Sequence, residues 1–166
     1  SYAYAHRLEE LTPQPIAYRE VRYCGILRES WYVCQESECE YTFNELIHNK
    51  TFPNRERILQ AIGRFTAELY QRGVFHQDSS GGTILFNEDG SKIEVIDLNR
   101  IKFYRKMPIK EGLQLFERLN IDKKALSILG ASFAETLGKD KDFVINYIIT
   151  HRWWKHVKQG ITNLYD

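Results

Sequence analysis

The residues whose types and spacing could do chemistry lie on two short loops. His76, Gln77 and Asp78 begin a loop of small residues, and Asp97 ends an apolar run further along the chain. Phosphoryl transfer needs one carboxylate that orients and deprotonates a hydroxyl and another that holds Mg²⁺ on the phosphates. We therefore interpret Asp78 as a candidate catalytic base and Asp97 as a candidate metal ligand.

The surroundings of these residues favour this interpretation. Asp78 lies between a long predicted helix and a predicted strand, so both sides of its loop are anchored. His76 is expected to be structural, with its imidazole bonding backbone carbonyls to hold the loop. Asp97 ends the apolar run 93–97, where a buried carboxylate is costly without a partner. Mg²⁺ is one such partner, and Arg100 or a helix N-terminus is the alternative.

Periodicity and capping signals predict the elements that must position these loops. The predicted helices cover residues 2–11, 42–49, 54–72, 111–119, 122–137 and 140–160. The predicted strands cover residues 16–23, 26–34, 83–86 and 93–98, and they form two antiparallel hairpins. Thr42 and Glu45 match a capping box, and Asp122 and Asp140 are expected N-caps. The order of elements predicts an α+β fold with a mainly helical second half.

Composition bounds the class of protein. The chain has 166 residues, 43% of them hydrophobic, which predicts one domain with a hydrophobic core. Its net charge of +1 gives no indication of a nucleic-acid partner, so none is expected. Cys24, Cys34 and Cys39 lack zinc-type spacing and are expected to be thiols in a reducing compartment. No apolar run reaches the roughly 18 residues of a membrane span, and no signal peptide opens the chain. We expect a cytoplasmic protein, and the first residues read as mid-helix, which indicates a fragment.

Three segments together resemble a known family. His76-Gln77-Asp78, the strand 84–86 and the segment 96–100 look like the lipopolysaccharide kinase (Kdo/WaaP) family, which is bacterial, kinase-like and phosphorylates sugars of the lipopolysaccharide core. The resemblance implies a protein-kinase-like α+β fold. Residues 1–37 would be a partial N-lobe of one helix, two strands and a hinge, and residues 38–166 a mainly helical C-lobe.

The resemblance also assigns roles and ligands. Asp78 would be the catalytic base and Asp97 the metal-binding aspartate, with ATP and Mg²⁺ as cofactors and a sugar or lipid-linked sugar as acceptor. The hinge that contacts adenine through backbone groups would be the segment formed by Gln35, Glu36 and Ser37. Such a protein would act in lipopolysaccharide biosynthesis in the bacterial cytoplasm.

Three positions depart from the family pattern or adapt it, and one further segment is expected outside the chain. Thr83 stands where an Asn binds the second metal, so it would offer that ion a hydroxyl in place of a carbonyl. Asn99 takes a glycine position and is expected to adopt a left-handed conformation there. Ala3 occupies the best match to a glutamate that pairs with the ATP-positioning lysine. That lysine and the Gly-rich loop are expected upstream of Ser1.

Two basic segments could contact other molecules. Trp153 and Trp154 lie in a basic aromatic helix, which could rest on the anionic inner membrane surface or pack one Trp into the C-lobe. Arg100, Lys102, Arg105 and Lys106 follow Asp97, near where a phosphorylated acceptor would bind; a plain solvated face is the alternative reading.

Three functions remain open from the sequence. The first is an ATP- and Mg²⁺-dependent phosphotransferase, with this fragment itself inactive because the lysine and Gly-rich loop lie outside it. The second is a non-catalytic kinase-like module, which Thr83 and the lysine–glutamate pair missing from this segment favour. The third is a helical interaction domain without nucleotide, which leaves the His76-x-Asp78 loop unexplained.

Overall fold

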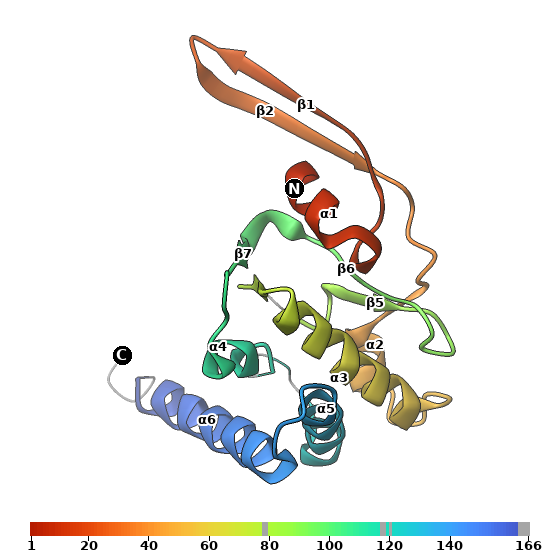
Figure 1. The fold of residues 1–166 in the computed structure, drawn as a ribbon, viewed down its shortest axis with the longest axis vertical. Helices are drawn as coiled ribbons and strands as arrows, with labels where there is room; N and C mark the ends of the chain where they lie inside the picture. The colour runs from red at the N-terminus through yellow and green to blue at the C-terminus, as the bar shows by residue number, and fades with distance from the viewer. Residues whose placement is uncertain (78–79, 117–118, 120, 163–166) are drawn as a thin grey trace.

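The chain folds as a mixed α+β molecule whose second half is helical (Figure 1). The computed structural model describes residues 1–77, 80–116, 119 and 121–162, and for residues 152–162 it describes the backbone alone. The α-helices are α1 (Tyr2–Leu8), α2 (Phe43–His48), α3 (Arg55–Gln71), α4 (Ile109–Gln114), α5 (Lys123–Thr136) and α6 (Lys141–Thr162). The strands are β1 (Pro15–Tyr23), β2 (Ile26–Cys34), β3 (Tyr41–Thr42), β4 (Val74–His76), β5 (Ile84–Phe86), β6 (Ile93–Val95) and β7 (Ile101–Phe103). Short 3₁₀ helices, η1 (Glu9–Leu11) and η2 (Leu98–Arg100), precede β1 and β7.

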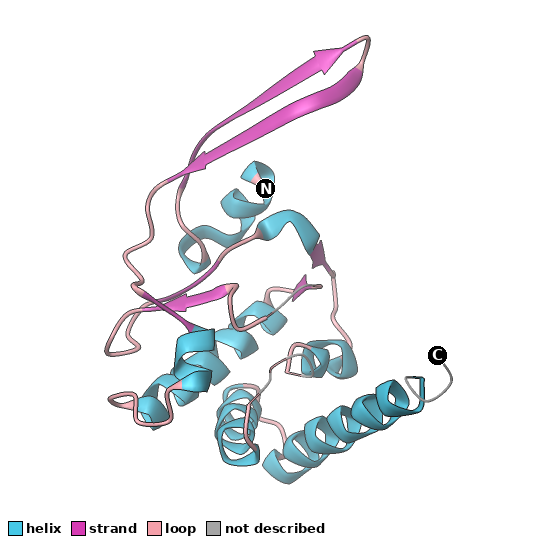
Figure 2. Cartoon of the chain, turned by 180° about the vertical axis from the view of Figure 1, so that it is seen from behind, coloured by secondary structure: helices cyan, strands magenta, loops and turns pink. Residues whose placement is uncertain are grey.

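Strands β1 and β2 form a long antiparallel hairpin that extends away from the rest of the molecule (Figures 1 and 2). The pairing runs from Pro15 opposite Cys34 to Tyr23 opposite Ile26, with two register shifts. Most of its side chains are exposed, including Trp31 at 59%. The Tyr18 ring contacts Tyr2 of α1, with 4.9 Å between ring centroids. Both predicted strands are therefore confirmed, but their large apolar side chains lie largely outside the core.

Two smaller sheets lie inside the body. Strands β3, β5 and β6 form an antiparallel sheet in that order, and β4 pairs with β7 in a separate two-stranded ribbon. The β5–β6 hairpin turns at Gly90, where φ is +70°, as the Asp89-Gly90 signal predicts. Strand β6 ends at Val95, earlier than the predicted residue 98, and β3, β4 and β7 were not predicted.

Helix α3 lies between two groups of buried side chains. One face packs on α5 so closely that a Cβ added to Gly63 would lie 2.6 Å from the Leu129 carbonyl oxygen. Another part of α3, with Phe65 and Leu69, joins α1, η1, β4, β6 and η2 in a second buried cluster. Residues from the predicted N-lobe and C-lobe therefore share this second cluster, and the division at residue 37 remains a prediction.

Local signals in the sequence fix the starts of three helices. The Thr42 hydroxyl accepts from the Glu45 amide while the Glu45 carboxylate accepts from the Thr42 amide, so the capping box is confirmed. The Asp122 carboxylate accepts from the Ala125 amide at 2.9 Å, which lowers the Asp122 pKa. The Asp140 carboxylate accepts from the Phe143 amide at 2.6 Å. Both predicted N-caps are confirmed.

The C-terminal helix α6 contains the segment that is predicted to contact a membrane surface. No helix within the part of the chain that the structure describes is long and apolar enough to cross a bilayer. The predicted contact of Trp153 and Trp154 with a membrane surface concerns side chains outside the described residues. It therefore stays a prediction.

Candidate functional site

The loop that carries the predicted base begins where β4 ends, at His76. The His76 side chain is 3% exposed, and its Nε2 lies 3.2 Å from the Ile96 carbonyl oxygen. A carbonyl can only accept, so Nε2 carries the proton and the imidazole donates this hydrogen bond. The predicted structural role of His76 therefore has a specific partner. Asp78 lies outside the described residues.

The other end of the same loop, at Thr83, bonds to the backbone amide of Ile96. The Ile96 amide donates to the Thr83 carbonyl oxygen at 2.9 Å. Both polar groups of Ile96 are thus bonded to the loop, one to the side chain of His76 and one to the backbone of Thr83. Because Asp97 follows Ile96 directly, the loop fixes the backbone from which the Asp97 carboxylate extends.

Asp97 is exposed and adopts a left-handed conformation, with φ 58° and ψ 62°. Its Oδ1 accepts a hydrogen bond from Asn99 Nδ2 at 3.2 Å, and within the described chain its side chain makes no capping bond to η2. Two expectations are wrong here. Asp97 is not buried, because β6 ends two residues earlier, and the left-handed residue is Asp97 instead of Asn99. An exposed carboxylate on a strained backbone is still a good candidate for a ligand site.

The Thr83 hydroxyl is already used within the loop. Its Oγ1 accepts from the Ser80 amide at 3.2 Å and donates to the Ser80 carbonyl at 3.0 Å. The residue is 8% exposed. One lone pair of the hydroxyl oxygen stays free, but the residue is buried and its hydroxyl is held by Ser80, so Thr83 fits a metal ligand poorly.

The three predicted hinge residues connect the hairpin to the body, and two of them already have partners. The Gln35 amide donates to the Gln14 carbonyl at 2.8 Å. The Ser37 hydroxyl donates to the Glu94 carboxylate and accepts from the Cys39 amide at 3.0 Å. Glu36 is exposed. Backbone groups of Glu36 and Ser37 are therefore the ones that could contact a planar base.

Glu94 is a buried acid that the sequence reasoning missed. It lies on β6 and is only 4% exposed. Ser37 and Lys92 both contact its carboxylate, and Lys92 Nζ lies 3.4 Å from it. Lys92 also pairs with Glu38 at 2.8 Å, which lowers the pKa of Glu38 and raises the pKa of Lys92. A single glutamate between two apolar strand residues gives no sequence signal of such pairing. Burial raises the pKa of the neighbouring Cys39 thiol.

A cavity of about 250 Å³ lies beside the hinge. Its lining residues come from the segments on both sides of the hairpin, from β6 and from the residue before β6, and they are Glu10, Thr12, Pro13, Gln14, Gln35, Glu36, Glu38, Lys92 and Glu94. Four of these side chains are carboxylates and one is an amine. Such a lining suits an uncharged hydrogen-bonding ring better than a phosphate group, because carboxylates repel phosphate.

Among the residues that the structure describes, no group of three or more His, Cys, Asp or Glu side chains could hold a metal ion. Mg²⁺ does not require such a cage, since it is commonly held by one or two carboxylates together with substrate phosphates and water. Asp97 meets that requirement as a single exposed carboxylate. The residues present therefore fit a nucleotide-bound Mg²⁺ through Asp97.

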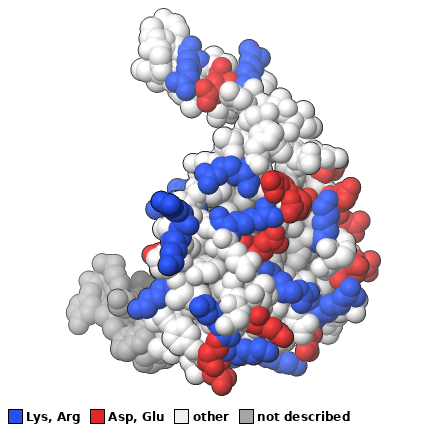
Figure 3. All heavy atoms as spheres, viewed as in Figure 1, with Lys and Arg blue, Asp and Glu red and all other residues white. Residues whose placement is uncertain are grey.

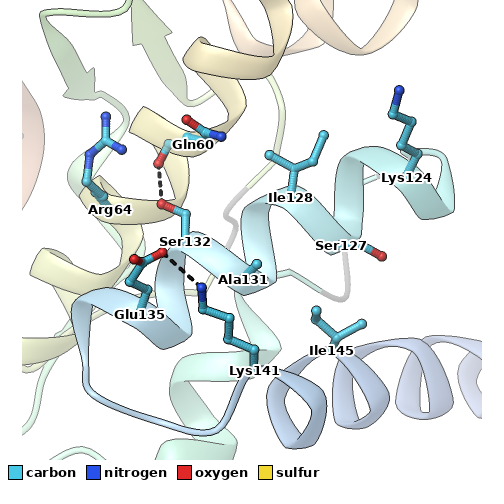
Figure 4. A pocket seen from close by; sticks show the side chains of 10 residues that line it. All are labelled: Gln60, Arg64, Lys124, Ser127, Ile128, Ala131, Ser132, Glu135, Lys141 and Ile145. Carbon is cyan, nitrogen blue, oxygen red and sulfur yellow. Dashed lines mark hydrogen bonds and ion pairs between the residues drawn. The ribbon is translucent and has the colours of Figure 1, made fainter.

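A second, larger cavity of about 480 Å³ lies between α3, α5 and the start of α6 (Figure 4). Ser132 donates to the Gln60 carbonyl at 2.7 Å on one side, and Lys141 pairs with Glu135 at 3.2 Å on another. Arg64 and Lys124 extend from opposite ends of the lining. None of the predicted site residues that the structure describes lines this cavity.

Comparisons with known proteins add no assignment. No protein-family model matches the chain, and no curated protein matches it significantly.

Proposed function

We propose that this chain belongs to an ATP- and Mg²⁺-dependent phosphotransferase with a protein-kinase-like fold, of the lipopolysaccharide-kinase type. The reaction transfers a phosphoryl group to a hydroxyl of a sugar or lipid-linked sugar, in the bacterial cytoplasm or at the inner membrane surface. Asp78 orients and deprotonates the hydroxyl, and Asp97 holds Mg²⁺ against the phosphates.

The observation that carries this proposal is that both backbone polar groups of Ile96 are hydrogen-bonded to the loop. The loop containing Asp78 bonds to both polar groups of the residue before Asp97, through His76 and Thr83. Phosphoryl transfer depends mainly on positioning and electrostatic stabilisation, so a fixed spacing between base and metal ligand is what it requires. A purely structural loop has no comparable need for an exposed carboxylate at this position.

The hinge region supports the nucleotide part of the proposal. Glu36 and Ser37 border the cavity of about 250 Å³ or lie next to its lining, and their backbone groups could bond an adenine edge. The Lys92–Glu94–Ser37 contacts fix this segment against β6, the strand that leads to Asp97. The hinge and the proposed metal ligand are therefore connected through one strand.

The test is phosphoryl transfer by the native polypeptide that contains this sequence, using radiolabelled ATP and a sugar acceptor. Asp78→Asn should lower turnover by roughly 10²–10⁴, the usual scale for a positioned base. Asp97→Asn should lower turnover and raise the Mg²⁺ concentration needed for half-maximal rate. Asp142→Asn, at an exposed position on α6, is the matched control and should change neither. Unchanged turnover in both site variants would refute the proposal.

A non-catalytic kinase-like module is the second candidate, and the Thr83 hydrogen bonds favour it. Since the Thr83 hydroxyl is buried and bonded to both backbone groups of Ser80, it is poorly placed to bind a second metal ion. In this case ATP would bind without transfer. Calorimetry with ATP and Mg²⁺, followed by product analysis, separates the two candidates. Metal-dependent ATP binding followed by turnover would exclude a non-catalytic module.

A further inference from the structure

The β4–β7 ribbon has two chemically different faces. In an antiparallel pair, residues opposite each other point to the same side, so His76 with Ile101 and Phe75 with Lys102 define opposite faces. His76 and Ile101 are buried against the core. On the other face Phe75 is half-buried, Lys102 is exposed, and the Tyr104 ring lies 6.2 Å from the Phe75 ring.

The chain beyond β7 is held at both ends of a short bend. The Tyr104 amide donates to the Gly73 carbonyl at 2.8 Å, and the Tyr70 hydroxyl donates to the Met107 carbonyl at 3.0 Å. Between these anchors lie Arg105 and Lys106, both exposed. The bend therefore presents two cations from a fixed backbone. We call Phe75, Lys102, Tyr104, Arg105 and Lys106 the cation–aromatic face.

The cations of this face have no acidic partner among the described residues. Lys102, Arg105 and Lys106 form no ion pair there, whereas Lys92 and Arg72 elsewhere each pair with two or more carboxylates. Figure 3 shows Lys and Arg gathered on the flank of the body that carries β7 and the chain leading to α4, with little Asp or Glu in between. Exposed cations without an acidic partner are available to an anionic ligand.

The cation–aromatic face begins next to the proposed reaction centre. The Gln77 amide, one residue before Asp78, donates to the Arg100 carbonyl at 3.1 Å. Arg100 in turn ends η2, which starts directly after Asp97. The ribbon thus continues from the two loops that carry the candidate base and metal ligand.

From these observations we propose that the cation–aromatic face binds a phosphate monoester already present on the acceptor sugar. The proposal rests on the proposed function and deepens it, since it specifies the acceptor class. Lys102, Arg105 and Lys106 neutralise the dianionic phosphate through charge-assisted hydrogen bonds. The rings of Tyr104 and Phe75 present an apolar surface to the C–H face of the sugar. The acceptor hydroxyl would then extend along the ribbon toward η2 and Asp97.

The test measures binding to the chain without ATP or Mg²⁺, by two-dimensional NMR titration at low ionic strength. The probes are inorganic phosphate, glucose and glucose 6-phosphate. Glucose 6-phosphate should bind more tightly than either other probe and should shift the amides of residues 102–106. The triple variant Lys102→Gln, Arg105→Gln, Lys106→Gln should weaken its binding by at least about tenfold. A matched triple variant on α5 and the turn after it, Lys123→Gln, Lys124→Gln, Lys139→Gln, removes the same charge and should change binding less than about twofold.

Two further arms make the result specific. Tyr104→Ala should weaken glucose 6-phosphate but not inorganic phosphate, and Tyr104→Phe should retain both. Vesicles containing phosphatidic acid present the same phosphate monoester on a lipid, so their binding against that of glucose 6-phosphate distinguishes a lipid-borne from a soluble acceptor. Equal loss in both triple variants, or unchanged binding in the first, would overturn the proposal.

Failure of this proposal and failure of the proposed function give different results. Phosphate binding is measured without nucleotide, and Asp97→Asn should leave it intact. If Asp97→Asn loses turnover but the parent chain binds none of the phosphate probes, the proposed phosphotransferase activity stands and the proposed acceptor class is rejected. Phosphate binding at the cation–aromatic face without any turnover would reject the phosphotransferase and, with it, the assignment of this ligand as an acceptor.

Discussion

The two antiparallel ribbons of this molecule, β1–β2 and β4–β7, differ in almost every property except their pairing. The strands of the first have nine residues each and those of the second have three. Yet the long ribbon is exposed on most of its surface, while the short one buries Val74, His76 and Ile101. The loop that begins at His76 and the candidate metal ligand Asp97 adjoin the short ribbon, whereas the long ribbon adjoins only the predicted hinge. Burial of one face, and not the number of backbone hydrogen bonds, therefore provides the rigid support that a site needs.

The largest expected difference between the ribbons concerns their glycines with positive φ. Gly73, at φ +69°, lies against Tyr104, and an added Cβ would overlap the Tyr104 carbonyl oxygen; Gly25, at φ +79°, has nothing within 4 Å. Gly73→Ala should therefore lower the free energy of unfolding by about 3 kcal/mol or more. Gly25→Ala should cost only the left-handed strain, about 1 kcal/mol. Urea denaturation measures both, and equal losses would show that the β4–Tyr104 contact is loose.

The second comparison uses one valine from each ribbon. Val74 in β4 is 2% exposed and Val33 in β2 is 49% exposed. Val74→Ala should lower the free energy of unfolding by about 2 kcal/mol, since it removes buried methyl groups and leaves a small cavity. Val33→Ala should change it by less than about 0.5 kcal/mol. If Val33→Ala proved as costly as Val74→Ala, the hairpin would be covered in solution by another surface.

The third prediction concerns the connection between the hairpin and the site. Thr12 is 3% exposed and precedes β1, and its hydroxyl donates to the Val95 carbonyl at 2.7 Å. Thr12→Val keeps the shape but removes the donor, so the free energy of unfolding should fall by about 1 kcal/mol. Thr12→Ser keeps the donor and should recover most of this loss. A Thr12→Val variant as stable as the parent would mean that this bond adds nothing to the connection.

The smallest effect is one on reactivity alone. Cys24 and Cys34 in the hairpin are exposed, whereas Cys39 in the body is buried and its thiol pKa is raised by that burial. Because the thiolate is the reactive form, iodoacetamide near neutral pH should modify Cys24 and Cys34 first and Cys39 slowly, with the Cys39 rate rising as the pH increases. Peptide mass spectrometry over a time course reads out each site. Equal rates for all three would mean that the segment around Cys39 opens readily.

The sequence predicted those elements whose signals are local. The hairpin of β1 and β2 has the expected limits to within one residue, because its aromatic and β-branched residues and the Cys24-Gly25 turn act over a few positions. The capping box at Thr42 and the N-caps at Asp122 and Asp140 are equally local and were confirmed.

Features that depend on distant partners were missed. Strand β7 has three residues and a lysine at its centre, so only its pairing with β4 makes it a strand. Glu94 is buried because Ser37 and Lys92 contact it, which no pattern around position 94 reveals. Within the candidate site, the backbone role of His76 was predicted, but the exposure and left-handed conformation of Asp97 depend on where β6 ends.

The two hydrogen bonds between the loop and Ile96 have a consequence for how this site could diversify. His76 and Thr83 fix the start and the end of the loop on the same residue, Ile96, which precedes Asp97. The spacing between the two ends is thus set by main-chain contacts and one imidazole. Side chains between them, such as Ser80, could be exchanged without moving Asp97, so acceptor preference and metal binding could evolve as separate traits.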